Sequence, residues 1–225
     1  MTVPEDAAPE YDCYQNAPLM YHHWYWDGRV WETTTWLGVP TLKSVSDMWN
    51  YQEILTELRP SLVVEFGTYM GGSALFFATI MDQLGDDYLV FTVDINRDTI
   101  RDEVLTHEHI EVYTASSADD RVRHRLEELR AAHPGSAFVI LDSDHREEHV
   151  RAELELLLPV LTRGDYLVVE DTNLNGHPVE PGYRPGPHEA VERFLAAHPN
   201  EFYQDRRRET KFGFTFAPDA FLVKQ

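Results

Sequence analysis

Cysteine is almost absent from this 225-residue chain, and a long apolar run is missing altogether. Cys13 is the single cysteine, so no disulfide can form within the chain and a disulfide-stabilised secreted scaffold is excluded. The chain contains no run of about 18 apolar residues that could form a transmembrane helix. The first ten residues are acidic, whereas a signal peptide begins with basic residues. We therefore expect a cytoplasmic protein that has no membrane partner.

Positive charge is also scarce, because 19 Lys and Arg face 39 Asp and Glu and the net charge is −20. A sequence-independent nucleic-acid binder needs a basic surface to neutralise phosphates, so we expect no nucleic-acid partner. With 43% hydrophobic residues the chain has ample material for a core, and its length suits one domain. A small molecule is the partner that this composition leaves open.

The chain divides into three segments of different texture. Residues 1–17 are polar and predict a flexible arm. Residues 18–60 hold all five tryptophans and predict an aromatic cap or lid, ending in a helix that Ser46 or Asp47 caps. Its apolar surface leads us to expect a homo-oligomer. Residues 61–225 predict a Rossmann-like domain.

Within the third segment, short apolar runs alternate with helical patterns, which is typical of a parallel sheet covered by helices on both faces. The last two strands, in FYQDRRR and FTFAPDAFLVK, should pair antiparallel. The sequence therefore predicts an α/β fold with a mostly parallel seven-stranded sheet and an antiparallel C-terminal strand. The other expected strands span 62–67, 88–94, 110–114, 137–142 and 166–170, and the expected helices span 72–84, 97–105, 119–132, 147–161 and 188–197.

A glycine-rich turn follows the first of these strands. Gly67, Gly71 and Gly72 allow positive φ and let a ligand approach the backbone near helix N-terminal amides. The pattern is not the GxGxxG dinucleotide fingerprint, because Tyr69 stands where the second glycine would admit a pyrophosphate. We expect Gly67, Tyr69 and Gly72 to contact a cofactor, although the glycines alone are also compatible with a simple tight turn.

The next two strand ends favour a nucleoside that carries an amino acid. Asp94 is placed to bind both hydroxyls of a ribose, and Ser116 and Ser117 could frame an adenine edge. This combination fits S-adenosylmethionine, with Glu65 or the turn near its methionine end. The alternative is that Asp94 only caps the following helix.

Three carboxylates follow the fourth and fifth strands. Adjacent parallel strands lie about 5 Å apart, so Asp142 should meet Glu170 and Asp171 at the carboxyl edge of the sheet. Carboxylates this close repel one another unless a cation joins them, and Mg²⁺ prefers oxygen ligands. Glu170 and Asp171 are adjacent in the sequence, so both can bind the ion only if the strand bends between them. Otherwise Asp171 is a turn residue and Asp142 lines the cofactor pocket, where we also expect it.

Histidines near this edge supply candidate bases. Residues 145–149 match HxxEH, the zinc motif of inverted zincins, but in those enzymes the motif lies inside a helix rather than directly after a strand. We interpret His145 as the general base, with His23 as its substitute if the lid folds over the site. Lys43 and Gln52 could contact the cofactor carboxylate or the acceptor, or simply be an exposed lysine and a helix-surface glutamine.

The acceptor side is expected in the 172–187 loop, which lacks periodicity and is long enough to be functional. Tyr183 and Arg184 in this loop, and Trp24 in the aromatic segment, are the candidate substrate contacts. In YHHWYW, packing of a cap is the alternative to a lid that stacks on a sugar or a polycyclic acceptor.

Together these motifs resemble the cephalosporin hydroxylase family, Rossmann-like proteins related to rhamnosyl and macrocin-type O-methyltransferases of natural-product biosynthesis. The resemblance implies S-adenosylmethionine near Glu65, Gly67, Ser73, Asp94 and Ser117, and Mg²⁺ at Asp142, Glu170 and Asp171. It is carried by YHHWYW, WLGVPTLKSVSDMWNYQEIL, VVEFGTYMGGSALFFA, VDINRD, LDSDHREEHV, YLVVEDT and GPHEAVERFL.

The sequence thus predicts an S-adenosylmethionine- and Mg²⁺-dependent O-methyltransferase that acts on a hydroxyl of a natural product, with a sugar as the first choice of acceptor. The metal would bind acceptor oxygens and lower the pKa of the hydroxyl. Two alternatives remain open. One is a catechol or phenol O-methyltransferase, and the other is a non-catalytic, cofactor-binding partner of a biosynthetic complex.

Overall fold

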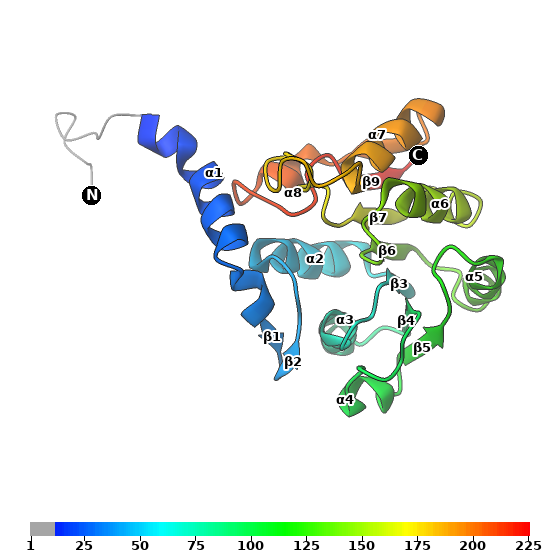
Figure 1. Cartoon of the computed structure of the whole chain (residues 1–225). Helices are drawn as coiled ribbons and strands as arrows, with labels where there is room; N and C mark the ends of the chain where they lie inside the picture. Colours follow the sequence, from blue (N-terminus) through cyan, green and yellow to red (C-terminus); the bar gives the residue numbers. More distant parts are fainter. Residues whose placement is uncertain (1–11) are drawn as a thin grey trace.

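The computed structural model describes residues 12–225, and the first eleven residues of the expected arm lie outside this range. Its centre is a seven-stranded sheet with the order β5-β4-β3-β6-β7-β9-β8 (Figure 1). The first five of these strands pair in parallel, and β9 pairs antiparallel with both β7 and β8. The predicted fold class is confirmed. The strands are β3 (Leu62–Phe66), β4 (Leu89–Asp94), β5 (Ile110–Thr114), β6 (Ala137–Leu141), β7 (Tyr166–Val169), β8 (Phe202–Gln204) and β9 (Phe221–Lys224).

Helices cover both faces of the sheet. Two of them, α2 and α3, lie on one side, and α5 and α6 lie on the other (Figure 1). A short antiparallel pair, β1 (Thr35–Trp36) with β2 (Val39–Pro40), packs beside α3. The helices are α1 (Asp12–Asp27), the 3₁₀ turn η2 (Val30–Thr33), α2 (Val45–Leu58), α3 (Gly72–Leu84), α4 (Asp102–Leu105), α5 (Asp120–Ala132), α6 (Glu147–Leu157), α7 (Pro187–Ala197) and α8 (Arg206–Thr210).

Several predicted boundaries differ from the structure. Residues 12–17, which we expected in the arm, form the first turns of α1. The cap of α2 is Ser44 rather than Ser46 or Asp47, because the Ser44 hydroxyl accepts the Asp47 amide. Asp47 is fully buried instead, and its carboxylate accepts the amide of Phe216 at 2.8 Å. Tertiary contacts thus decide which of three neighbouring polar residues caps the helix.

The aromatic segment packs through only part of its ring surface. Tyr25 and Trp26 join a buried cluster with Leu174, Val179, Phe214 and Phe216, which ties α1 to the chain after β7. Trp24, one position away, is 59% exposed because successive residues of a helix point in different directions. The segment therefore packs as a cap through one face, and the homo-oligomer stays a prediction. Within residues 12–225, no helix is both long and apolar enough to cross a membrane.

Gly67 allows β3 and β6 to approach each other where the sheet ends. Its φ is +98°, and a Cβ there would lie 1.9 Å from the carbonyl oxygen of Asp142. We expect Gly67→Ala to lower the free energy of unfolding by at least about 3 kcal/mol, from backbone strain and overlap together. That loss corresponds to a melting temperature roughly 6–12 °C lower.

The matched control is Gly164→Ala. Gly164 has nearly the same φ, +93°, but a Cβ there meets nothing within 4 Å. Strain alone should cost about 1–2 kcal/mol. Thermal melts that give equal losses for the two variants would show that the contact with Asp142 is not what makes Gly67 necessary.

Candidate active site

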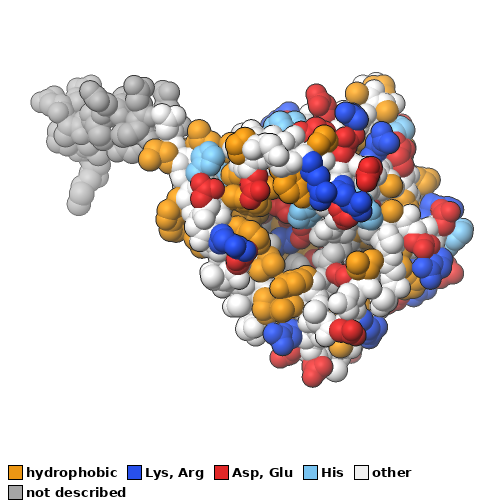
Figure 2. Space-filling view, viewed as in Figure 1, with side chains coloured by type: hydrophobic (Ala, Val, Ile, Leu, Met, Phe, Trp, Pro, Cys, Tyr) orange, Lys and Arg blue, Asp and Glu red, His pale blue; other side chains and the backbone are white. Residues whose placement is uncertain are grey.

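A cavity of ≈ 1270 Å³ opens over the carboxyl ends of the parallel strands. Figure 2 shows it as a hollow in the face of the molecule, with acidic and apolar side chains around it. Pockets for drug-sized ligands measure about 300–1,000 Å³, so this cavity has room for two reactants. The C-terminal end of every parallel strand contributes to the cavity wall. The residues are Gly67 and Thr68 after β3, Asp94 at the end of β4, Ser116 and Ser117 after β5, Asp142 after β6 and Asp171 after β7.

Asp94 shapes the glycine-rich turn as well as lining the cavity. One of its carboxylate oxygens accepts the amides of Thr68 and Tyr69, both at 2.9 Å, and the other accepts the amide of Asn96 at 2.9 Å. A carboxylate offers about four lone-pair sites, so one remains for a ligand. The alternative that Asp94 caps the next helix is wrong, because α4 begins at Asp102 and its N-cap is Arg101.

The two serines after β5 differ in their surroundings. Ser116 is exposed, whereas Ser117 is buried and its hydroxyl lies 3.0 Å from His149 Nε2. His149 Nε2 is in turn 3.3 Å from the fully buried Glu153. The HxxEH histidines therefore separate, because His149 joins this polar network while His145 turns to the sheet edge.

The sheet edge brings together Asp142, His145 and Asp171, whose ligand atoms all lie within 4.8 Å of one another. His145 Nε2 is 3.2 Å from Asp171 Oδ2 and 3.5 Å from Asp142 Oδ1. The chain bends at Asp171, where φ is +58°, directly after β7. This is the bend that the sequence requires if both Glu170 and Asp171 are to face the site.

Glu170 lies deeper than the other two carboxylates and is only 3% exposed. Its Oε1 accepts the Tyr51 hydroxyl at 2.6 Å and lies 3.1 Å from Lys43 Nζ. Lys43, also 3% exposed, pairs with Asp142 as well. An ammonium therefore links Asp142 and Glu170 in this structure, and it partly offsets the repulsion between them.

The electrostatics of the cluster move several pKa values. Burial alone would lower the pKa of His145, but the carboxylates of Asp171 and Asp142 outweigh it and raise the pKa to about 9. Burial raises the pKa of Asp171 to about 7, with Asp142 and Glu170 adding to the shift. Burial would raise the pKa of Asp142, yet Lys43 and His145 hold it below its usual value. Perturbed groups gathered in one cavity are typical of a functional site.

Not every predicted site residue reaches the cavity. Tyr69, Gly72, Ser73 and Tyr183 belong to its wall. Six others lie outside the wall that residues 12–225 define, namely His23, Trp24, Gln52, Glu65, Glu170 and Arg184. His23 and Trp24 miss the cavity because successive residues of α1 point in different directions, and Trp26 and Asp27 face the cavity instead. Arg184 is exposed and stacks over the Tyr183 ring at 5.4 Å.

Glu65 is buried beneath the cavity rather than exposed in it. It accepts the Thr92 hydroxyl at 2.7 Å, and Ser73, which does line the cavity, opposes the upward shift of its pKa. Burial raises its pKa to about 7 despite the nearby Lys43. Glu65 therefore lies behind the cavity wall and is not a direct contact for a cavity ligand.

Sequence reasoning missed part of the wall. Trp26 and Trp31 stack on each other with ring centroids 5.3 Å apart, and Trp26 Nε1 donates to Glu180 at 3.2 Å. All three residues line the cavity. The clustering of tryptophans before Trp36 was a signal for an aromatic wall, but it could not single out these two. Tyr51, which donates to Glu170, lies behind the wall and gave no signal, because its spacing fits an ordinary apolar helix face.

A family model described as Rhamnosyl O-methyltransferase/CmcI matches residues 28–225. The chain belongs to this family. The resemblance noted from the sequence is confirmed, and so is the O-methyltransferase class.

Relatives of known name agree with this family. The chain is 50% identical over 204 residues to the rhamnosyl O-methyltransferase of Mycobacterium tuberculosis, which covers 91% of this chain and 83% of that protein. It is 50% identical over 205 residues to the enzyme of the same name from Mycobacterium leprae, covering 91% and 89%. A structure of CmcI with Mg and SAM superposes with a TM-score of 0.70 at 20% identity, over 86% of this chain and 77% of CmcI, and supports the fold.

Proposed function

We propose that this protein transfers a methyl group from S-adenosylmethionine to a hydroxyl of a sugar, with Mg²⁺ at the sheet edge. The observation that carries the proposal is one cavity that contains both the Asp94 turn and the Asp142, His145 and Asp171 group. The relatives of 50% identity are named for a rhamnosyl acceptor, so a rhamnoside is the first acceptor to test.

The cofactor end of the cavity fits the nucleoside. Asp94 keeps a lone pair for the ribose, and Ser117 offers a hydroxyl to the adenine edge. Glu65 Oε1 is buried without a hydrogen-bond partner among the described residues, so an unsatisfied acceptor lies just behind the cavity wall. A cavity this acidic attracts the positive sulfonium and ammonium of S-adenosylmethionine.

The opposite end fits a hard divalent cation. Asp142 and Asp171 offer carboxylate oxygens beside each other, and Glu170 adds a third carboxylate behind them. Lys43 and a protonated His145 supply two positive charges against these three carboxylates. Asp142, Asp171 and Glu170 would hold the ion, and when bound Mg²⁺ supplies a Lewis acid for acceptor oxygens.

The chain's own residues then handle the proton. His145 Nε2 faces both Asp142 and Asp171, which orient the ring and stabilise its charged form. Methyl transfer releases one proton from the acceptor hydroxyl, and we assign its capture to His145 Nε2. His23 does not reach the cavity wall and is not needed as a substitute in this arrangement.

Aromatic side chains make the acceptor wall. Trp26, Trp31 and Tyr183 line the cavity from α1, η2 and the 170–186 loop. Flat rings of this kind stack on the apolar face of a sugar, and Glu180 beside them can accept its hydroxyls. The same wall also suits a phenol, which keeps catechol methylation as the second candidate.

The deciding experiment compares two acceptors under one set of conditions. We expect the purified protein with S-adenosylmethionine and Mg²⁺ to add one methyl group to a simple phenyl rhamnoside, detected by mass spectrometry, and to leave catechol unchanged. Faster methylation of catechol would instead favour a catechol or phenol O-methyltransferase.

A binding measurement separates a catalyst from a non-catalytic partner. S-adenosylhomocysteine at a hundredfold excess over Kd should add about 2.7 kcal/mol, a melting shift of roughly 5–11 °C. Such a shift without methylation of either acceptor would support the cofactor-binding partner. Absence of any shift would contradict the cofactor assignment itself.

A further inference from the structure

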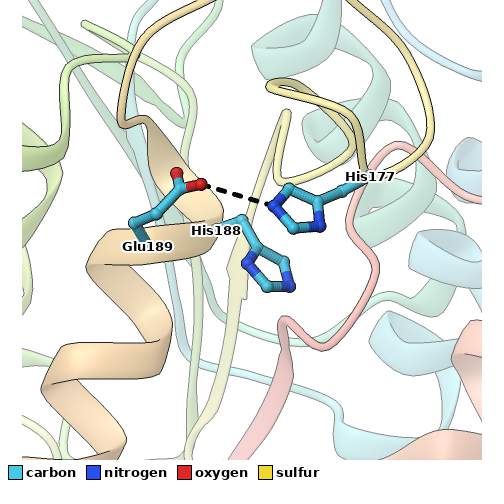
Figure 3. A group of neighbouring side chains, drawn as sticks. All are labelled: His177, His188 and Glu189. Atoms are coloured by element: carbon cyan, nitrogen blue, oxygen red, sulfur yellow. Dashed lines mark hydrogen bonds and ion pairs between the residues drawn. The ribbon is translucent and has the colours of Figure 1, made fainter. Parts of the chain in front are cut away.

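A second cluster of side chains that could ligate a metal lies outside the cavity wall that residues 12–225 define. His177 comes from the 170–186 loop, and His188 and Glu189 come from the first turn of α7 (Figure 3). Their ligand atoms all lie within 4.8 Å of one another. His177 Nε2 and Glu189 Oε1 are 3.3 Å apart.

Glu189 is held in place by the chain around it. Its Oε1 accepts Asn175 Nδ2 at 2.8 Å, and its Oε2 accepts the amide of Gly186 at 2.7 Å. Burial would raise the pKa of Glu189, but these hydrogen bonds outweigh it and lower the pKa. The carboxylate is therefore ionised and already oriented.

His188 presents one nitrogen without a protein partner. Its Nε2 lies 3.4 Å from Asp219 Oδ2, whereas its Nδ1 is buried and has no hydrogen-bond partner among the described residues. The Asp219 carboxylate favours the proton on Nε2, which leaves a lone pair on Nδ1. A histidine that donates one ring N–H to a carboxylate and ligates through the other nitrogen is the usual arrangement at protein metal sites.

We propose that His177, His188 and Glu189 form a second metal site, selective for Zn²⁺ or a similar transition ion. Two imidazoles and one carboxylate suit zinc, whereas Mg²⁺ favours oxygen ligands. In a tetrahedral site with bonds of about 2.0–2.1 Å, neighbouring ligand atoms lie roughly 3.3 Å apart. His177 Nε2 and Glu189 Oε1, hydrogen-bonded at 3.3 Å in this structure, are already close to this separation before the ring turns, and water completes the coordination.

Binding requires one ring to turn. The two imidazoles stack with centroids 3.6 Å apart and planes 12° from parallel, and a cation bound by both must lie near both ring planes. His177 is the ring that moves, because its side chain is 34% exposed and belongs to a loop. Zinc would then fasten this loop to α7. Since the loop also carries Tyr183 and Glu180, zinc would steady the acceptor wall, a consequence that rests on the proposed function.

The test measures metal binding rather than activity. We expect the full chain, with excess Mg²⁺ and no cofactor, to bind one Zn²⁺ in calorimetric titration and to give the intense visible bands of tetrahedral Co²⁺. His188→Ala and His177→Phe should each weaken binding by at least about tenfold, the latter while keeping a stacked ring. Asp219→Asn should weaken it by about 10–100-fold.

Two controls define the alternatives. His198→Ala removes a histidine from the other end of α7, where it pairs with Glu155, and should bind zinc normally. Asp142→Ala removes a carboxylate of the sheet edge and should also keep the zinc. Loss of binding in Asp142→Ala, or unchanged affinity in both His177→Phe and His188→Ala, would overturn the proposal. Neither result bears on methyl transfer.

Discussion

Asp142→Asn is expected to lower kcat/KM for methyl transfer by about 10³-fold, equivalent to roughly 4 kcal/mol of transition-state stabilisation. Asp142 directly follows β6, pairs with Lys43 and faces His145 Nε2 at 3.5 Å. The asparagine keeps the shape of the side chain but removes its negative charge. Both the affinity for a cation at the sheet edge and the orientation of the base should suffer.

The measurement is a Mg²⁺ titration of the initial rate. Wild-type activity should fall on removal of Mg²⁺ with a chelator and return when Mg²⁺ is restored, whereas Asp142→Asn should respond weakly at any concentration. S-adenosylhomocysteine should still bind the variant, because the Asp94 turn is intact. Asp120→Asn makes the same change on the exposed face of α5 and serves as the control. Full activity of Asp142→Asn in saturating Mg²⁺ would contradict this role.

The sheet and the position of the cavity were predictable because they depend on local patterns. A parallel strand that is buried on both faces is expected to be apolar at nearly every position. All five residues of Leu62–Phe66 are buried, and only Glu65 among them is not apolar. The residues that follow such runs then share one sheet edge. Asp94, Ser117, Asp142 and Asp171 all lie at the cavity for this reason.

The cap and the counter-charges could not be predicted in the same way. Lys43 meets Glu170 across more than a hundred residues, and no local spacing records that pairing. A helical segment rich in rings likewise does not reveal its register on the body of the protein. The sequence therefore favours Trp24 no less than Trp26, although of these two only Trp26 faces the cavity.

His145→Gln is expected to reduce kcat by about 10²–10⁴-fold while leaving the binding of S-adenosylhomocysteine unchanged, because the variant lacks a group that can take the acceptor proton. The rate should be measured from pH 6 to pH 10, with His124→Gln on the exposed face of α5 as control. The wild-type rate should rise with pH as His145 loses its proton, and the residual rate of His145→Gln should lack that rise. A variant with an unchanged pH profile would show that another group takes the proton.

The pH range of this rise follows from the surroundings of His145. Asp171 and Asp142 raise its pKa from the ordinary 6.5 to about 9, so without a divalent ion the ring is charged at neutral pH and cannot act as a base. Because the folded-state pKa is raised, the stabilisation it gives is complete below about pH 6.5 and is lost as the pH rises through about 9. Thermal melts of chelator-treated protein should show this loss, and it should be smaller in His145→Gln.

A cation held by the same carboxylates opposes the charge on the His145 ring and lowers its pKa. Mg²⁺ should therefore move the rise in rate to lower pH, so that the carboxylates that keep the base protonated without metal allow it to work when metal is present.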